Sequence, residues 1–182
     1  MDVKRLAIIG TGLIGASVGL AAKRAGVEQV DGYDVSESTL ETARERGAID
    51  TAATAADGVA GADLVVVAAP VIALRSVLRG ALEAGAPADA RRPSATVTDV
   101  GSTKSNLADA LTSPRFVGGH PVTGSEAHGP EHATADLFDG ATWFLTPHAA
   151  TDPGRYRSLH GFVGSLGAAP VAIDPEAHDR LL

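Results

Sequence analysis

Short apolar segments alternate with longer segments of helical spacing along most of this chain. Residues 6–9 and 63–69 are apolar runs, and the second lacks polar alternation, which is typical of a strand buried on both faces. Residues 13–25 are small and apolar at helical spacing, and Gly26 is placed to end that helix. The alternation predicts a parallel sheet with helices on both faces. The expected strands are 3–9, 29–33, 63–69, 95–100, 116–117, 142–146 and 170–173, the expected helices are 13–25, 36–47, 71–82, 106–111 and 153–167, and residues 84–93 are expected to be a surface connection.

Length and composition limit the class of protein. The 182 residues suffice for one sizeable core, and the hydrophobic fraction of 45% excludes a disordered tail or a fibre. A net charge of −7 with scattered Lys and Arg argues against a nucleic-acid or membrane surface as partner. The chain has no cysteine, which excludes disulfides and thiolate chemistry and fits a cytoplasmic location.

The N-terminal stretch also resembles a secretory signal peptide. Lys4 and Arg5 precede the apolar and small residues 6–22. Four glycines in that stretch would weaken an apolar signal helix, so a strand, a turn and a helix fit better. The longest other apolar run, 64–74, is interrupted by Pro70 and is too short to span a bilayer.

A glycine-rich turn separates the first strand from the first helix. Residues 10–15 read Gly-Thr-Gly-Leu-Ile-Gly, and Asp34 ends the second strand. In this pattern the glycines permit a tight turn, close approach to a pyrophosphate, and helix packing, while the helix N-terminus offers N–H groups to phosphate. Asp34 would accept hydrogen bonds from ribose hydroxyls and repel a 2′-phosphate, so we expect NAD rather than NADP. The expected cofactor-binding residues here are Gly10, Thr11, Gly12, Leu13, Ile14, Gly15 and Asp34.

These features favour an α/β fold of Rossmann type, doubly wound, with a mostly parallel sheet. The alternative is a glycine turn with no ligand. Two further strand ends would meet a cofactor, because ligands bind at the carboxyl ends of parallel strands: Ala69 and Pro70 follow one strand, and Gly101 and Ser102 follow another. Ala69 and Pro70 could instead be an ordinary strand exit. Ser102 could orient a neighbouring group or cap the next helix, and Lys104 could contact a ligand, although a lysine here is more often solvated.

The segment 116–126, Phe-Val-Gly-Gly-His-Pro-Val-Thr-Gly-Ser-Glu, is the most informative. Its glycines and proline predict a sharply shaped loop after a short strand. His120 could take a proton near neutral pH, and beside a nicotinamide it could accept a carbinol proton as hydride leaves. His128 and His132 have the spacing of zinc ligands on a helix, but Pro130 lies between them, so we expect no metal site.

Together these segments resemble the nucleotide-binding domain of the prephenate/arogenate dehydrogenase family. The resemblance rests on residues 10–17, 101–104 and 118–126, and on 137–140, 144–147 and 176–179 in the expected order. It covers essentially the whole chain, and the segment around His120 is its most specific part.

The resemblance implies an NAD-dependent oxidative decarboxylation of prephenate or arogenate to the 4-hydroxyphenyl product in tyrosine biosynthesis. His120 would polarise or deprotonate the ring hydroxyl, and Ser102 would hold His120 and contact the cofactor. Ser125 and Glu126 would face the substrate. The sequence does not separate prephenate from arogenate.

The family continues into a helical domain that forms a homodimer and supplies a substrate-binding arginine. We therefore expect a cofactor domain over 1–174 and the start of a helical domain at 175–182, where the role of His178 is open. These residues alone should bind NAD but turn over poorly. Two alternatives remain: another Rossmann dehydrogenase of the 3-hydroxyacid or pyrroline-carboxylate reductase type, and a non-catalytic NAD-binding module.

Overall fold

The structure, a computed structural model, describes residues 3–52, 61–84, 94–104, 107, 112–123 and 127–181. Its strands are β1 Arg5–Ile9, β2 Gln29–Tyr33, β3 Thr51–Ala52, β4 Leu64–Val67, β5 Thr96–Asp99, β6 Phe116–Pro121, β7 Thr142–Thr146 and β8 Ala169–Ala172. Its α-helices are α1 Leu13–Arg24, α2 Glu37–Glu45, α4 Val71–Ala84, α5 Pro153–Ser165 and α6 Pro175–Leu181, and Pro130–His132 form a 3-10 turn, η3.

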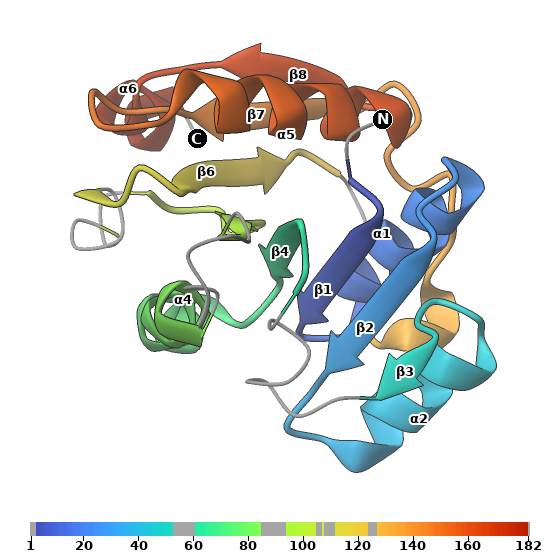
Figure 1. Cartoon of the computed structure of the whole chain (residues 1–182). Coiled ribbons are helices and arrows are strands. Elements are labelled where there is room, and N and C mark those ends of the chain that lie inside the picture. Colours follow the sequence, from blue (N-terminus) through green and yellow to red (C-terminus); the bar gives the residue numbers. More distant parts are fainter. Residues whose placement is uncertain are drawn as a thin grey trace.

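Within this part of the chain the strands form one sheet in the order β3-β2-β1-β4-β5-β6-β7-β8 (Figure 1). The strands from β3 to β6 run parallel, whereas β7 is antiparallel to β6 and β8 is parallel to β7. The Rossmann-type, mostly parallel α/β fold expected from the sequence is therefore confirmed. The short strand β3 was not predicted.

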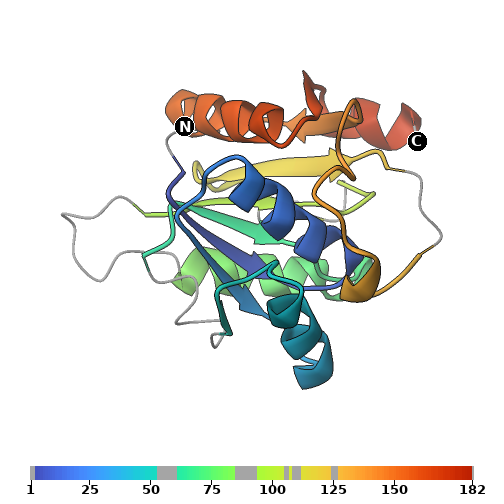
Figure 2. The ribbon, with the colours of Figure 1, turned by 90° about the vertical axis from the view of Figure 1, so that its right-hand side faces the viewer.

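Helices cover both faces of the sheet. Helices α1, α2 and α5 pack on one face and α4 on the other, as Figures 1 and 2 show from two directions. On β1, Ile8 belongs to the core beneath α1 and Ile9 to the core beneath α4. Successive side chains of a strand point to opposite faces, so an inner strand with both faces covered must be apolar throughout. Burial on both faces therefore explains the continuous apolar runs of the sequence.

Local signals set the helix boundaries close to where the sequence predicts them. Gly26 and Gly167 have φ angles of 94° and 93° after α1 and α5, a conformation that glycine adopts without strain. The Ser36 side chain accepts a hydrogen bond from the Thr39 amide and caps α2. The helix expected at 106–111 lies largely outside the described residues, as do residues 85–93 of the expected surface connection.

The expectation of a loop at 118–121 is wrong, because β6 continues through these residues. The antiparallel neighbour β7 pairs with them, from Gly118 opposite Thr146 to Pro121 opposite Trp143. A side chain at 118 would strike the Thr146 hydroxyl, so glycine permits close strand packing here and does not shape a turn. Glycine and proline are depleted in strands, and only the distant partner strand overrides that preference.

The strand register brings three strand ends to one level. Ile9 of β1 pairs with Val67 of β4, and Val67 pairs with Asp99 of β5. The residues that follow each strand therefore meet at the carboxyl edge of the sheet, while β6 extends beyond that edge along β7. This is where ligands bind in doubly wound sheets.

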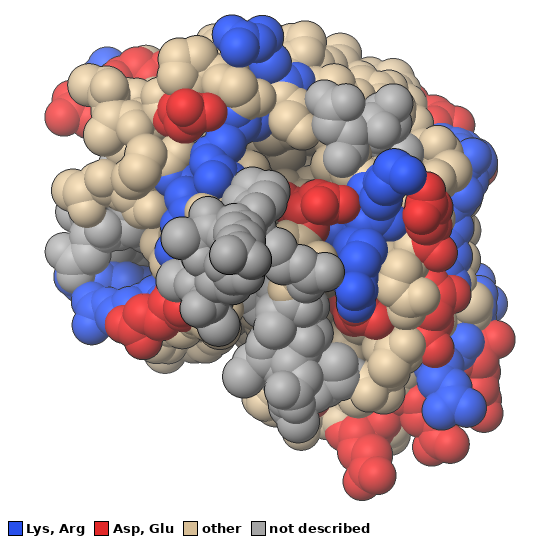
Figure 3. Space-filling model, in the orientation of Figure 1, with Lys and Arg blue, Asp and Glu red and all other residues tan. Residues whose placement is uncertain are grey.

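The surface carries both signs of charge. On the face shown in Figure 3, Lys and Arg side chains lie intermixed with Asp and Glu. Among the helices described, none is both long enough and apolar enough to cross a membrane.

Candidate functional site

A cavity of about 500 Å³ lies at the carboxyl edge of the sheet. It joins the start of α1, the exit of β4, the turn after β5 and the end of β6, so segments far apart in the sequence share one site. Nine of the residues singled out from the sequence line it: Gly12, Leu13, Ile14, Gly15, Ala69, Pro70, Gly101, Ser102 and His120. Other lining residues, including Thr123 and His128, were not predicted to belong to a site.

The glycine turn presents backbone to this cavity. Gly10 has a φ angle of 96°, and a Cβ on Gly15 would collide with the Gly10 carbonyl oxygen, so the turn and α1 pack too closely for side chains. A Cβ on Gly12 would meet no atom within 4 Å. Gly12 is also the N-cap of α1 and makes no side-chain capping bond. Gly12, Leu13, Ile14 and Gly15 line the cavity, so the start of α1, with its partial positive charge, borders a space that suits a phosphate group.

Asp34 lies beside the cavity and not in its lining. Its Oδ2 accepts a 2.8 Å hydrogen bond from the backbone amide of the buried Thr11, and its Oδ1 accepts one of 2.9 Å from the Ser36 amide. These bonds fix the carboxylate next to the glycine turn. The Thr11 hydroxyl also donates to Oδ2, over 3.4 Å, so Oδ1 is the Asp34 oxygen that keeps a lone pair for a further donor. Gly10, Thr11 and Asp34 thus support the cavity wall.

Asp99 and Lys104 form an ion pair with both side chains fully buried. The Lys104 Nζ lies 2.5 Å from Asp99 Oδ2 and donates to the carbonyl oxygens of Gly101 and Gly119. Asp99 in turn accepts from the Gly101 and Gly119 amides. The interpretation of Lys104 as a solvated side chain is wrong. All three ammonium protons have partners, and the pair fixes the turn after β5 against β6.

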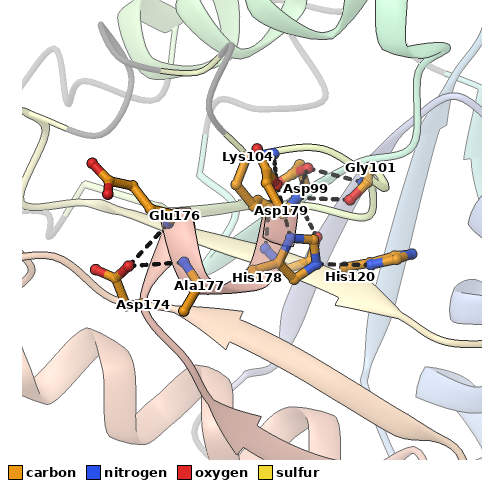
Figure 4. Close-up of polar contacts among 10 residues, drawn as sticks. Asp99, Gly101, Lys104, His120, Asp174, Glu176, Ala177, His178 and Asp179 are labelled. Carbon is orange, nitrogen blue, oxygen red and sulfur yellow. Dashed lines mark hydrogen bonds and ion pairs between the residues drawn. The ribbon is translucent and has the colours of Figure 1, made fainter. Parts of the chain in front are cut away.

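His120 is half-buried on β6 and lines the cavity together with the glycine turn. Its Nδ1 lies 2.9 Å from Nε2 of His178, a fully buried residue of α6 (Figure 4). The Nδ1 of His178 lies 2.9 Å from Oδ1 of Asp179, and the same oxygen accepts the Lys104 backbone amide. Asp179, His178 and His120 thus form one chain of contacts.

This environment keeps His120 neutral. Burial, followed by the positive charge of Lys104 and then by His178, lowers the pKa of the His120 imidazole to about 4, against a smaller opposing effect of Asp179. A neutral imidazole has a lone pair that can accept a proton, so His120 is in the base form at neutral pH.

The remaining predicted residues are less well placed by the structure. Ser102 is exposed at the rim of the cavity, and within the described part of the chain the ring contact of His120 is made by His178 and not by Ser102. Ser125 and Glu126 lie outside the described residues. No three His, Asp or Glu side chains gather as a metal site in the ranges that the structure describes.

Three comparisons describe what the chain is similar to. The family model "Prephenate dehydrogenase, nucleotide-binding domain" matches residues 18–171. The probable prephenate dehydrogenase NovF of Streptomyces niveus is 36% identical, covering 96% of this chain and 46% of the relative. The chain spans about half the length of the curated relatives it matches first.

Solved structures agree with this match. The Aquifex aeolicus prephenate dehydrogenase in complex with hydroxyphenyl propionate and NAD+ superimposes with a TM-score of 0.88 at 28% identity, covering all of this chain and 63% of that one. The Synechocystis arogenate dehydrogenase gives a TM-score of 0.86 at 31% identity, covering 97% and 62%.

Proposed function

This chain belongs to the prephenate dehydrogenase family through its nucleotide-binding domain, and we propose that it holds NAD and the catalytic base of a prephenate or arogenate dehydrogenase. The observation that carries the proposal is the cavity itself. His120 lines it together with Gly12 and the first residues of α1, so a base and a phosphate-binding helix end share one space.

The residues present fit a dinucleotide. The open position at Gly12 leaves room for a pyrophosphate against the α1 amides, and the Asp34 carboxylate can accept hydrogen bonds from ribose hydroxyls. Ala69, Pro70 and Gly101 offer small walls along the same edge. NAD, when bound, would supply the hydride acceptor.

In the proposed reaction His120 receives the proton of the substrate's ring hydroxyl. The carbon that bears the hydroxyl loses hydride, the ring carboxylate leaves as carbon dioxide, and its bonding electrons complete an aromatic ring. The gain of aromaticity makes the step strongly favourable. We assign Ser102 a contact with the cofactor at the cavity rim, and Ser125 and Glu126 a place on the substrate side.

Several parts of the proposal rest on the family resemblance. These are a small-molecule substrate, a homodimer formed through a helical domain that begins at residues 175–182, and low turnover by residues 1–182 alone. The role in tyrosine biosynthesis rests on the resemblance. The cytoplasmic location rests on the resemblance and on the absence of cysteine. Helix α6 contacts β6 through His178. It therefore contributes to the site whether or not it begins a helical domain.

Calorimetric titration of the chain with NAD and NADP tests the cofactor site. We expect NAD to bind and NADP to bind at least about tenfold more weakly, because Asp34 repels a 2′-phosphate. Equal affinities would refute the role of Asp34. Binding of neither nucleotide to the folded chain would refute the site.

Substitution of His120 by Asn in the natural full-length protein tests the base. We expect kcat with prephenate or arogenate to fall by about 10²–10⁴ with the NAD affinity unchanged. His160→Asn is the matched control, since His160 is exposed on α5. Unchanged turnover in His120→Asn would contradict the proposal. Turnover of 3-hydroxyacids in place of prephenate would favour the other dehydrogenase class, and NAD binding without any turnover would favour a non-catalytic module.

A further inference from the structure

We propose that His178 and Asp179 are positioning residues that fix His120 as the tautomer protonated at Nδ1, leaving Nε2 as the atom that receives the substrate proton. This inference deepens the proposed function and rests on it for the role of Nε2. The tautomer itself follows from the contacts among α6, β6 and the turn after β5, which Figure 4 shows together.

The argument begins at Asp179, whose Oδ1 is a hydrogen-bond acceptor. The Lys104 backbone amide can only donate, and it lies 2.8 Å from this oxygen. The His178 Nδ1 lies 2.9 Å from the same oxygen. A carboxylate has no proton to give, so the proton of this second contact belongs to His178 Nδ1.

The next step concerns the other nitrogen of His178. Its side chain is fully buried, and its ring centroid lies 5.7 Å from that of Phe144, with the two rings nearly perpendicular. In the neutral ring a proton on Nδ1 makes Nε2 an acceptor. The 2.9 Å contact between His178 Nε2 and His120 Nδ1 then takes its proton from His120.

His120 with a proton on Nδ1 keeps an unprotonated Nε2, on the side of the ring away from His178. Because His120 lines the cavity, this nitrogen is the one available to a substrate hydroxyl. As Nε2 takes up a proton, the ring becomes an imidazolium whose Nδ1–H remains bonded to His178, and the Asp179 carboxylate beyond it stabilises the charge. The Lys104 ammonium opposes that charge, but Asp99 pairs with it directly. The lowered pKa of His120 agrees with a neutral ring before the reaction.

Nitrogen NMR of the ¹⁵N-histidine-labelled chain tests the tautomer without any turnover. Long-range ¹H–¹⁵N correlations distinguish protonated from unprotonated ring nitrogens, and the loss of signals in His120→Asn assigns the ring. At pH 7 we expect His120 to be protonated at Nδ1 and bare at Nε2, with His178 also protonated at Nδ1. A proton on Nε2 of His120 would overturn the inference.

Variants of His178 test the positioning role. His178→Leu keeps an apolar side chain in the buried site and removes the acceptor, so we expect the His120 tautomers to mix and kcat to fall roughly 10–100-fold, with the KM for NAD unchanged. His178→Gln offers an amide oxygen to His120 Nδ1 and should restore part of both readouts. Glu176→Gln, an exposed change on the same helix, should alter neither.

The outcomes separate this inference from the proposed function. If His178→Leu left both the His120 tautomer and kcat unchanged, the positioning role would be overturned. If His178→Leu fails to fold, the spectrum of the unaltered chain still decides the tautomer. Absence of dehydrogenase turnover in the full-length protein, with His120 found in the Nδ1–H form, would refute the proposed function and leave the tautomer assignment standing.

Discussion

The two sides of the cavity are built by different physical means. The glycine side, residues 10–15 with Asp34, is made of backbone amides and close helix packing, and its one charged side chain is fixed by backbone donors. The charged side brings together Asp99, Lys104, His120, His178 and Asp179, and it is held by buried side chains. The first side offers open space and backbone amides to a ligand, and the second defines a protonation state.

The difference shows where each side is vulnerable. The glycine side loses ligand binding when any atom is added, because a ligand there needs the open space and the backbone amides. The charged side loses stability when any atom is removed, because each buried polar group depends on its partner. The following substitutions test this contrast.

The largest effect is expected from Lys104→Met. It removes the cation and leaves the Asp99 carboxylate buried and unpaired, which should lower the free energy of unfolding by about 3–5 kcal/mol. Urea or thermal unfolding measures the loss. Lys23→Met is the matched control: Lys23 also pairs with an aspartate, Asp50, but both side chains are partly exposed, so about 1 kcal/mol or less is expected.

A double variant decides whether Lys104 acts through Asp99. Asp99→Asn together with Lys104→Met removes both charges, and we expect it to be more stable than Lys104→Met alone. Equal losses in Lys104→Met and Lys23→Met would contradict the picture of a charged side held by its buried pair.

The next effect is a contrast between two glycines of the same turn. Gly15→Ala places a methyl group against the Gly10 carbonyl and should cost about 1–3 kcal/mol of stability as well as NAD binding. Gly12→Ala points its methyl group into open space, so the stability should change by less than about 0.5 kcal/mol while NAD affinity falls. Unfolding and calorimetric titration of both variants measure this. NAD binding by Gly12→Ala at the original affinity would show that the open space is not the phosphate site.

An intermediate effect is expected from pH. The folded state holds the pKa of His120 at about 4, whereas the unfolded chain has the ordinary value of 6.5, so the unfolded state binds more protons between these values. The stabilising contribution is complete above pH 6.5 and is lost as the pH falls towards 4. Urea unfolding from pH 7 to 4.5 should therefore show a steeper decline for the original chain than for His120→Asn. Parallel declines would show that His120 is not shifted.

The smallest effect is expected from Ser36→Ala. It removes the hydrogen bond from the Thr39 amide that caps α2, at a cost of about 1 kcal/mol. The Ser36 backbone amide that donates to Asp34 is retained, so NAD affinity should stay the same. A large loss of NAD binding would mean that the α2 cap, and not the backbone alone, positions Asp34.

The glycine side could be predicted from the sequence because turn chemistry and the order of adjacent strands determine its contacts. Thr11 and Asp34 are 23 residues apart and follow adjacent strands, so turn chemistry and strand order were enough to place them. Gly12 and Gly15 sit at a strand-to-helix junction that the hydrophobic pattern locates. Ser36 likewise precedes a helical pattern directly.

The charged side could not be assembled from the sequence alone. His120 and His178 are 58 residues apart, and Lys104 and Asp179 are 75 apart, and no periodicity connects such pairs. The strand through Gly118 and Gly119 exists because β7 pairs with it, against the local preference of glycine. Lysine is almost never fully buried, so the residue type alone predicts a solvated Lys104. The burial follows from the ion pair with Asp99, which the sequence does not reveal. His178 was noted as part of the family pattern, without a role.

The position of His178 in the last helix has a consequence for synthesis on the ribosome. Residues up to Asp34 emerge first, and the chain is extended at about 5–20 residues per second, so His178 follows roughly 7–29 s later. During that interval the nascent chain contains the whole glycine turn, whereas His120 is first absent and, once synthesised, has no partner at Nδ1 until His178 follows. The glycine turn and Asp34 are therefore complete early in translation, and the ordered proton acceptor is completed only as α6 docks.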